Sequence, residues 1–311
     1  MRIIRIRGDY LIKTVKLTYA ALNCRNVKKM VDYYENVIGL TVVESTNDDT
    51  FYLSTGLEHH NLVLTSSENS ELSTIGFHVS ADENLLEIQT NLKAQGIQSE
   101  LKHDFQPGVH ELLELEDPDG YKVHLLQNIE MPAPGFKKNS ICPQKLGHIA
   151  LGSLNPELSN EFYMKVLNFK HTDRIGERAI FLTCNSDHHV LNISKFGHKM
   201  MHHIAFELKD SSHHTLSADF LSQNGKALSW GPFRHTAGHN LASYHHDPEL
   251  NVIELFTDMD QFIPELNYFD PRPWHAELPM RPKVWENNCT WYDSFEKNIT
   301  DYVLDKVQLS K

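Results

Sequence analysis

The chain has 311 residues, of which 40% are hydrophobic and 23% charged, a composition typical of a globular protein with room for two domain cores. Its formal net charge of -12 argues against nucleic acid or an anionic membrane as the main partner. No stretch approaches the roughly 18 continuous apolar residues of a transmembrane helix, so we expect no membrane span.

The N-terminus and the cysteines bear on the compartment. Met1–Arg7 is basic but lacks the apolar core of a signal peptide. The four cysteines lie far apart and show no paired spacing. We therefore expect free thiols and a cytoplasmic protein.

The first half of the chain is predicted to contain two helices among short strands. Apolar residues at spacings of three and four predict a helix over 27–38, and a second helix is predicted over 83–95; a glycine follows each. Asp117-Pro118-Asp119-Gly120 has the residues of a tight turn. Strands are predicted over 15–22, 41–44, 50–54, 61–65, 74–80, 110–116 and 122–127.

The second half has the same order of elements, with helices predicted over 157–167 and 212–224. The alternation after Met201 places His203 on one strand face and His202 on the other, where we expect a wall residue. The proline-rich tail predicts an extended arm with a short helix near 293–303. Strands are predicted over 146–153, 171–175, 179–183, 189–194, 202–208, 241–246 and 252–257.

The two halves are related by an internal repeat. Lys16–Leu22 matches Lys145–Leu151 and Ile75–Val79 matches Ile204–Leu208, both at an offset of 129 positions (148 − 19 and 204 − 75). Such repetition indicates a duplicated unit, and mixed strands and helices predict an α+β fold with antiparallel sheets. The predicted organisation is an N-terminal domain (1–130), a linker (131–143), a C-terminal domain (144–260) and an extended arm (261–311).

Three side chains of the second copy are candidate metal ligands. His148, His203 and Glu254 each lie on a predicted strand. Two imidazoles and one carboxylate on one sheet face match a 2-His-1-carboxylate site, which leaves up to three coordination positions open. This ligand set favours Fe(II), with Mn(II) as the second choice.

A structural role is the competing interpretation, because a single histidine in a strand is more often structural or exposed than a ligand. Glu254 is harder to explain in this way, since buried carboxylates are rare unless they are paired or bind a metal. The first copy has Tyr19, Thr74 and His124 at the equivalent positions, which is a poor ligand set. The fold therefore does not demand the ligands, and the first domain is predicted to hold a vestigial, metal-free site.

Five motifs of the second copy extend the pattern: Leu146–Leu151, Asp187–His189, Met201–Phe206, Gly231–His235 and Tyr244–Thr257. Together they resemble type I extradiol ring-cleaving catechol dioxygenases, two-domain members of the vicinal oxygen chelate (glyoxalase, bleomycin resistance protein and dioxygenase) superfamily. The resemblance covers about residues 10–260. It implies two βαβββ modules in each domain, with iron only in the C-terminal cavity.

The resemblance also implies catalytic residues. His189, 14 positions before His203, matches the family's acid/base histidine, for which a pKa near neutrality would be suitable. His235 and Tyr244, 19 and 10 positions before Glu254, match its substrate-side residues. An aromatic 1,2-diol would bind the metal through two oxygens and O2 would bind beside His189. No role is predicted for His188, His202, His239, His245 or His246.

Departures from the family pattern leave the diol undefined. The turn Asp247-Pro248-Glu249-Leu250 replaces the usual Asp-Pro-Asp-Gly, which concerns only a hairpin. Some members have polar or glycine-rich substrate contacts in the loop 195–200, which here reads Lys195-Phe196-Gly197-His198-Lys199-Met200. Arg234 could bind a carboxylate of the substrate or lie on the surface.

Two other functions remain as alternatives. A glyoxalase-like or epimerase-like metal enzyme is disfavoured by the matches at His189, His235 and Tyr244. A metal-free small-molecule binding protein would have a broken ligand trio, whereas His148, His203 and Glu254 are all present. The expected partners are an aromatic diol and O2, and a homo-oligomer would be in keeping with the resemblance.

Overall fold

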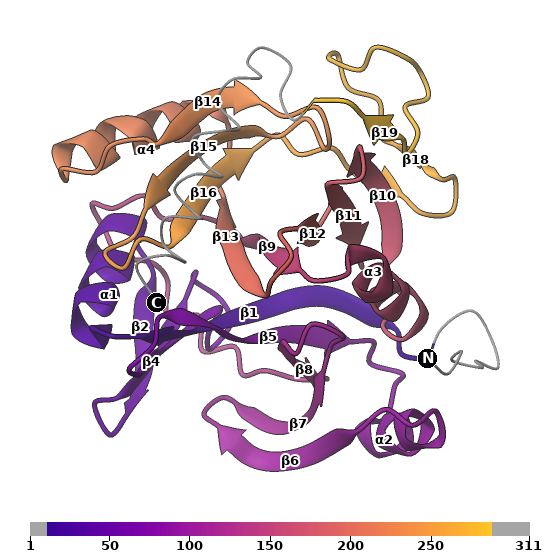
Figure 1. Cartoon of the computed structure of the whole chain (residues 1–311). Helices are drawn as coiled ribbons and strands as arrows, with labels where there is room; N and C mark the ends of the chain where they lie inside the picture. The colour runs from indigo at the N-terminus through magenta and orange to yellow at the C-terminus, as the bar shows by residue number, and fades with distance from the viewer. Residues whose placement is uncertain (1–10, 288–311) are drawn as a thin grey trace.

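The computed structural model describes residues 11–287, and two large sheets dominate it (Figure 1). The first sheet has eight strands in the order β2-β3-β4-β1-β5-β8-β7-β6. β1 and β5 form its antiparallel centre, and β4 and β8 run parallel to them on either side. Its strands are β1 (Thr14–Cys24), β2 (Thr41–Thr46), β3 (Thr50–Ser54), β4 (Leu62–Ser66), β5 (Glu71–Val79), β6 (Ser99–Gln106), β7 (Val109–Glu116) and β8 (Lys122–Leu126).

The second sheet repeats this arrangement and gains one strand from the C-terminal arm. Its nine strands have the order β14-β15-β16-β13-β9-β12-β11-β10-β19, with β9 and β13 as the antiparallel centre. The strands are β9 (Lys145–Ser153), β10 (Lys170–Ile175), β11 (Ala179–Thr183), β12 (Leu191–Lys195), β13 (Met200–Glu207), β14 (Trp230–Arg234), β15 (Leu241–His246), β16 (Val252–Thr257) and β19 (Val284–Trp285).

The helices flank the two sheets, and two of them lie where the sheets meet (Figure 1). They are α1 (Val27–Tyr33), continued by the π-helix η1 (Tyr34–Ile38), α2 (Leu85–Ala94), α3 (Pro156–Lys165) and α4 (Ser211–Gln223). Asn84, Asn155 and Asp210 cap α2, α3 and α4, because each side chain accepts a hydrogen bond from a free backbone N–H of the first turn. None of the helices within 11–287 is long and apolar enough to cross a membrane.

Strand register confirms the duplicated α+β architecture. Tyr19 lies opposite Gly76 in the first sheet, as His148 lies opposite Ala205 in the second. Gly76 pairs in turn with His124, and Ala205 with Glu254. Each sheet therefore consists of two modules that meet at a central antiparallel pair. β6 and β14 were not predicted, the first because it is polar and largely solvent-accessible, the second because it contains Pro232.

The two copies contact one another through reciprocal hydrogen bonds. Asp117, in the turn of the first copy, accepts a bond from the Tyr163 hydroxyl of the second copy (3.0 Å). Asp247, in the equivalent turn of the second copy, accepts one from the Tyr34 hydroxyl of the first (3.3 Å). Buried apolar residues of both copies also form one continuous core. The Asp-Pro turns therefore help to fix the orientation of the two sheets.

The arm packs against the second sheet. Its hairpin strands β17 (Phe262–Ile263) and β18 (Tyr268–Phe269) pair with each other, and β19 extends the sheet in parallel beside β10. The helix predicted near 293–303 lies outside the described residues.

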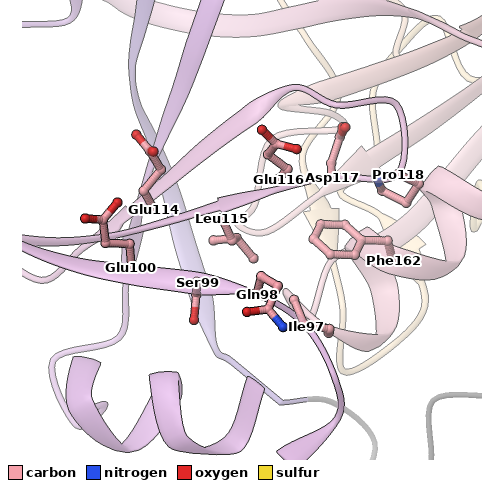
Figure 2. Close-up of a pocket in the computed structure, with 10 residues that line it drawn as sticks. All are labelled: Ile97, Gln98, Ser99, Glu100, Glu114, Leu115, Glu116, Asp117, Pro118 and Phe162. Carbon is pink, nitrogen blue, oxygen red and sulfur yellow. The ribbon is translucent and has the colours of Figure 1, made fainter. Parts of the chain in front are cut away.

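A pocket of about 490 Å³ lies between the first sheet and α3 (Figure 2). Its apolar lining includes Leu115 and Phe162, and its carboxylates include Glu100 and Glu114. Glu114 is already engaged, since its oxygens bind Lys102 at 2.9 Å and His124 at 2.7 Å. None of the residues that line this pocket is among the predicted site residues.

Candidate metal centre

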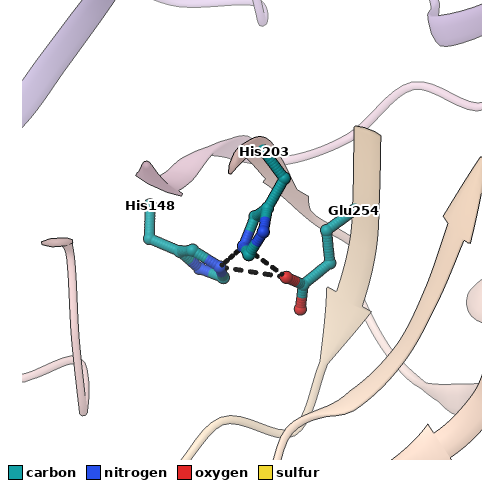
Figure 3. Close-up of side chains that lie close together, drawn as sticks. All are labelled: His148, His203 and Glu254. Atoms are coloured by element: carbon teal, nitrogen blue, oxygen red, sulfur yellow. Dashed lines mark hydrogen bonds and ion pairs between the residues drawn. The ribbon is translucent and has the colours of Figure 1, made fainter. Parts of the chain in front are cut away.

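His148, His203 and Glu254 converge from three neighbouring strands of the second sheet (Figure 3). Nε2 of His148 lies 3.1 Å from both Nε2 of His203 and Oε2 of Glu254, and the latter two atoms are 3.0 Å apart. The residues are only 1%, 8% and 1% exposed, respectively. Three potential ligand atoms thus form a nearly equilateral triangle in the interior of the second domain.

The size of this triangle fits one face of an octahedron. Ligands about 2.1–2.2 Å from an ion and at right angles to each other are about 3.0–3.1 Å apart, whereas tetrahedral ligands at about 2.1 Å would be about 3.4 Å apart. The donor set and the spacing therefore suit a divalent ion with three protein ligands on one side. The opposite face would be available to other ligands.

The protonation states also suit a metal. Burial by itself raises the pKa of the Glu254 carboxyl, but His148 and His203 lower it, and the net pKa is well below its usual range. Burial lowers the pKa of His148, and the nearby Glu254 offsets only part of that effect. A neutral imidazole and an ionised carboxylate are the forms that bind metal ions.

Two further side chains hold the Glu254 carboxylate. The Tyr244 hydroxyl donates to Oε2 (2.9 Å), and Nδ2 of Asn240 donates to Oε1 (2.8 Å). Burial, reinforced by Glu254, raises the pKa of Tyr244 well above its ordinary value, so the hydroxyl keeps its proton. Nε2 of His235 lies 2.7 Å from the same hydroxyl. His235 and Tyr244 are thus beside the triad, and Asn240 is a contact that the sequence did not predict.

The prediction that His202 lies on the opposite strand face from His203 was wrong. A register irregularity between Met201 and His203 interrupts the pairing of β13 with β9. Nδ1 of His202 therefore lies 2.7 Å from Nδ1 of His203, although strict alternation would place the two side chains on opposite faces. A ligand histidine commonly forms such a bond through its second ring nitrogen. Nδ1 of His148, in contrast, has no hydrogen-bond partner among the described residues.

His189 lies against the triad, in the irregular segment that precedes β12 rather than in the strand itself. Its ring centroid is 4.3 Å from that of His148 and 5.0 Å from that of Phe181. Burial, followed by the proximity of His148 and His188, lowers the pKa of His189 well below its ordinary value. This lowered pKa favours the neutral imidazole of His189.

The equivalent positions in the first copy form a different structure. The Tyr19 hydroxyl is 2.5 Å from Nδ1 of His124, and Nε2 of His124 is 2.7 Å from Oε2 of Glu114. The Tyr19 ring also occupies the space above Gly76, where an added Cβ would lie 2.3 Å from it. These side chains bond to each other and fill the space in which the second copy gathers its three ligand atoms.

A second group with potential ligand atoms lies near the arm. Oδ2 of Asp260 is 2.7 Å from Nδ1 of His239, and Oδ1 is 2.9 Å from Nε2 of His275 and 3.2 Å from Nε1 of Trp274. Each Asp260 oxygen thus already accepts a hydrogen bond. Because His275 and Trp274 belong to the arm, these bonds attach the arm to the second domain. Arg234 also binds here, because its guanidinium donates to the His239 carbonyl (2.5 Å) and stacks on Trp274.

The paired sheets define a duplicated protein whose second copy gathers His148, His203 and Glu254 where the first copy has Tyr19, Thr74 and His124. The model of the glyoxalase/bleomycin resistance protein/dioxygenase superfamily matches residues 16–125 and 145–255. The chain therefore belongs to this superfamily, and both copies are members.

Characterised relatives are distant but cover much of the chain. It is 24% identical over 266 residues to a manganese-dependent 2,3-dihydroxybiphenyl 1,2-dioxygenase of Geobacillus genomosp. 3, across 78% of this chain and 84% of that one. It is 27% identical over 199 residues to an iron-dependent extradiol dioxygenase of Rhodococcus jostii, across 56% and 66%.

Solved structures show the same fold. The 2,3-dioxygenase LapB of Pseudomonas sp. KL28 superposes with a TM-score of 0.77 at 19% identity, over 89% of this chain and 99% of that one. A Mn(II)-bound glyoxalase of Novosphingobium aromaticivorans gives 0.75 at 23% identity, over 88% of each chain.

Proposed function

We propose that the chain is an extradiol dioxygenase that cleaves a catechol-type diol with O2 at a mononuclear, non-haem metal centre. The observation that carries the proposal is the triangle of ligand atoms, 3.0–3.1 Å on a side and buried in one copy only. Relatives named as extradiol dioxygenases that use manganese or iron support the same activity. The proposal includes the division of the chain into a metal-free N-terminal domain (1–130), a linker (131–143), a catalytic domain (144–260) and an arm (261–311).

Nε2 of His148, Nε2 of His203 and Oε2 of Glu254 would hold the ion, with Fe(II) as the first choice and Mn(II) as the second. When bound, such an ion acidifies a coordinated hydroxyl and couples a diol to O2 electronically. Tyr244 and Asn240 orient the carboxylate through bonds of 2.9 and 2.8 Å, and His202 orients His203. These contacts would keep the ligand atoms in place when substrate enters.

His235 and Tyr244 would manage a proton on the substrate side. The Tyr244 proton is directed at Glu254, so Nε2 of His235 donates to the Tyr244 oxygen over 2.7 Å. These two hydrogen bonds connect the Glu254 carboxylate to the His235 imidazole through Tyr244. A proton would move along them as a diol binds. Both residues are buried, so water competes little for these bonds.

His189 would act on the other side of the triad. It is neutral and buried, so its imidazole can accept a proton from the second diol hydroxyl and return it when the ring opens. Phe181 contacts its ring and limits the directions in which it can turn. In this role His189 is unprotonated before the substrate binds.

A glyoxalase-like lyase or isomerase is the second candidate, because a manganese-bound glyoxalase has the same fold. That function would proceed without O2. A metal-free binding protein is disfavoured by three ligand atoms spaced as an octahedral face requires.

Anaerobic loading with Fe(II) or Mn(II), followed by addition of O2 and a panel of catechols, tests the proposal. We expect one O2 consumed for each diol and a product that absorbs visible light. Metal-loaded protein that consumes no O2 with any diol, but converts a 2-oxoaldehyde–thiol adduct, would replace the dioxygenase function by the lyase function.

A further inference from the structure

His188, the residue before His189, is the middle member of a buried hydrogen-bonded chain. Its Nδ1 lies 2.9 Å from Nδ1 of His189, and its Nε2 lies 3.0 Å from Oδ2 of Asp173. Asp173 and His188 are 2% and 0% exposed. This series of hydrogen bonds therefore leads from the triad, through the imidazoles of His189 and His188, to the Asp173 carboxylate on β10.

The arm contributes further hydrogen bonds to this series. Oδ1 of Asp173 accepts a bond from the Lys283 backbone N–H (2.8 Å), and Oδ2 accepts one from Nε1 of Trp285 (2.7 Å). The His188 ring also stacks on Phe269, with centroids 5.1 Å apart. Three contacts from the arm thus fix the Asp173 carboxylate and the His188 imidazole.

For two neutral imidazoles, the order of donors and acceptors follows from this geometry. Because Asp173 acts as an acceptor, Nε2 of a neutral His188 carries the proton and its Nδ1 is an acceptor. Nδ1 of His189 must then be the donor in the bond between the two rings. A neutral imidazole has one N–H, so Nε2 of His189 is left with a free lone pair.

The first copy retains the same arrangement in a weaker form. Glu44, His59 and His60 each precede Asp173, His188 and His189 by 129 positions. Nδ1 of His59 lies 3.0 Å from Nδ1 of His60, but its Nε2 is 3.4 Å from Glu44, whose side chain is 48% exposed. Only the copy with the metal ligands buries the carboxylate and covers it with the arm.

We propose that Asp173 and His188 are positioning residues that hold His189 in the Nδ1–H tautomer, with Nε2 free to accept a proton from the substrate. The proposal rests on the dioxygenase function proposed above. It assigns the arm a part in catalysis, since Trp285 and the Lys283 backbone hold Asp173. A purely structural role would need the buried bonds but not this tautomer.

Three variants and a control test the proposal in the full chain. His188→Phe keeps the stacked ring but cannot accept the bond from His189, whereas the amide oxygen of His188→Gln can. Asp173→Asn leaves one acceptor oxygen for His188, Lys283 and Trp285, which now donate to two carboxylate oxygens. His59→Phe makes the same change in the first copy and serves as the matched control.

We expect H188F to lower kcat by about 10- to 100-fold, with the KM for the diol and the bound metal within about twofold of wild type. H188Q should recover at least half of that loss on a logarithmic scale, D173N should lower kcat in the same direction, and H59F should leave kcat unchanged. If H188F retains kcat within twofold, or if H59F is equally impaired, the proposal is overturned.

Nitrogen NMR of the metal-free protein gives a readout that does not depend on turnover. With the His189 signals assigned from a His189→Gln sample, we expect the proton on Nδ1 in wild type and H188Q, and its loss from that position in H188F. A proton on Nε2 in wild type would overturn the proposal even if the enzyme is active. Absence of diol cleavage in wild type would refute the dioxygenase function and leave the NMR test of the tautomer intact.

Discussion

Replacement of Glu254 by glutamine tests whether the buried triangle binds a metal. Glutamine has nearly the same shape, and its oxygen can accept a bond from Asn240 or Tyr244 as the carboxylate does. It lacks the single negative charge of the proposed ligand set, which a divalent ion needs. The variant should therefore fold and yet bind the ion far more weakly.

The effect can be read as a metal-dependent shift in melting temperature. An ion at about 100 times its Kd stabilises the native state by about 2.7 kcal/mol. At about 2–4 °C per kcal/mol for a protein of this size class, wild type should melt roughly 5–10 °C higher with metal than without. We expect no such shift in E254Q.

The assay is differential scanning calorimetry of chelator-treated protein, with Mn(II) in air or Fe(II) under anaerobic conditions. His124→Gln is the matched control, because His124 occupies the position of Glu254 in the first sheet. It should retain the metal-dependent shift. A full shift and one bound ion per chain in E254Q would refute the ligand assignment.

Three further predictions address the surroundings of the centre. His189→Gln should keep one metal per chain but lose about 10²- to 10⁴-fold in kcat, and unchanged turnover would contradict its role as acid/base. Tyr19→Phe should lower the free energy of unfolding by about 1–3 kcal/mol, measured in urea, because it removes the hydroxyl bonded to His124; a loss of diol cleavage as well would show that the first copy takes part in the reaction. Burial raises the pKa of Asp117 from 3.8 to about 6, so the folded chain binds this proton more tightly than the unfolded chain, and the resulting stability is full below pH 3.8 and lost as the pH rises through 6. Relative to wild type, Asp117→Asn should therefore gain about 1.4 kcal/mol of unfolding free energy between about pH 5 and 7.5, and an unchanged or falling difference would be inconsistent with the raised pKa.

The sequence predicted the duplication because the repeat preserves strand register as well as residue type. Tyr19 and His148 are 129 positions apart, and so are the residues that lie opposite them, Gly76 and Ala205. The helices predicted over 83–95 and 212–224 are observed at Leu85–Ala94 and Ser211–Gln223, where Asn84 and Asp210 cap the first turns. β6 was missed because its residues are polar and many are exposed, so no apolar alternation marks it.

The surroundings of the metal centre depended on contacts that periodicity does not encode. A local irregularity in β13 brings His202 beside His203, and a period of two cannot anticipate it. Asp173 reaches His188 across strands, 15 positions away, and its other partners come from the arm. The lowered pKa of His189 results from burial among other imidazoles, which only the packed structure shows.

Anomalous diffraction from crystals loaded with Mn(II) or Fe(II) tests the account most directly. The account predicts one strong peak within about 2.1–2.2 Å of Nε2 of His148, Nε2 of His203 and Oε2 of Glu254, with the remaining positions filled by water or a diol. A peak at Asp260 with none at Glu254, or no peak in crystals of protein that cleaves catechols, would contradict it.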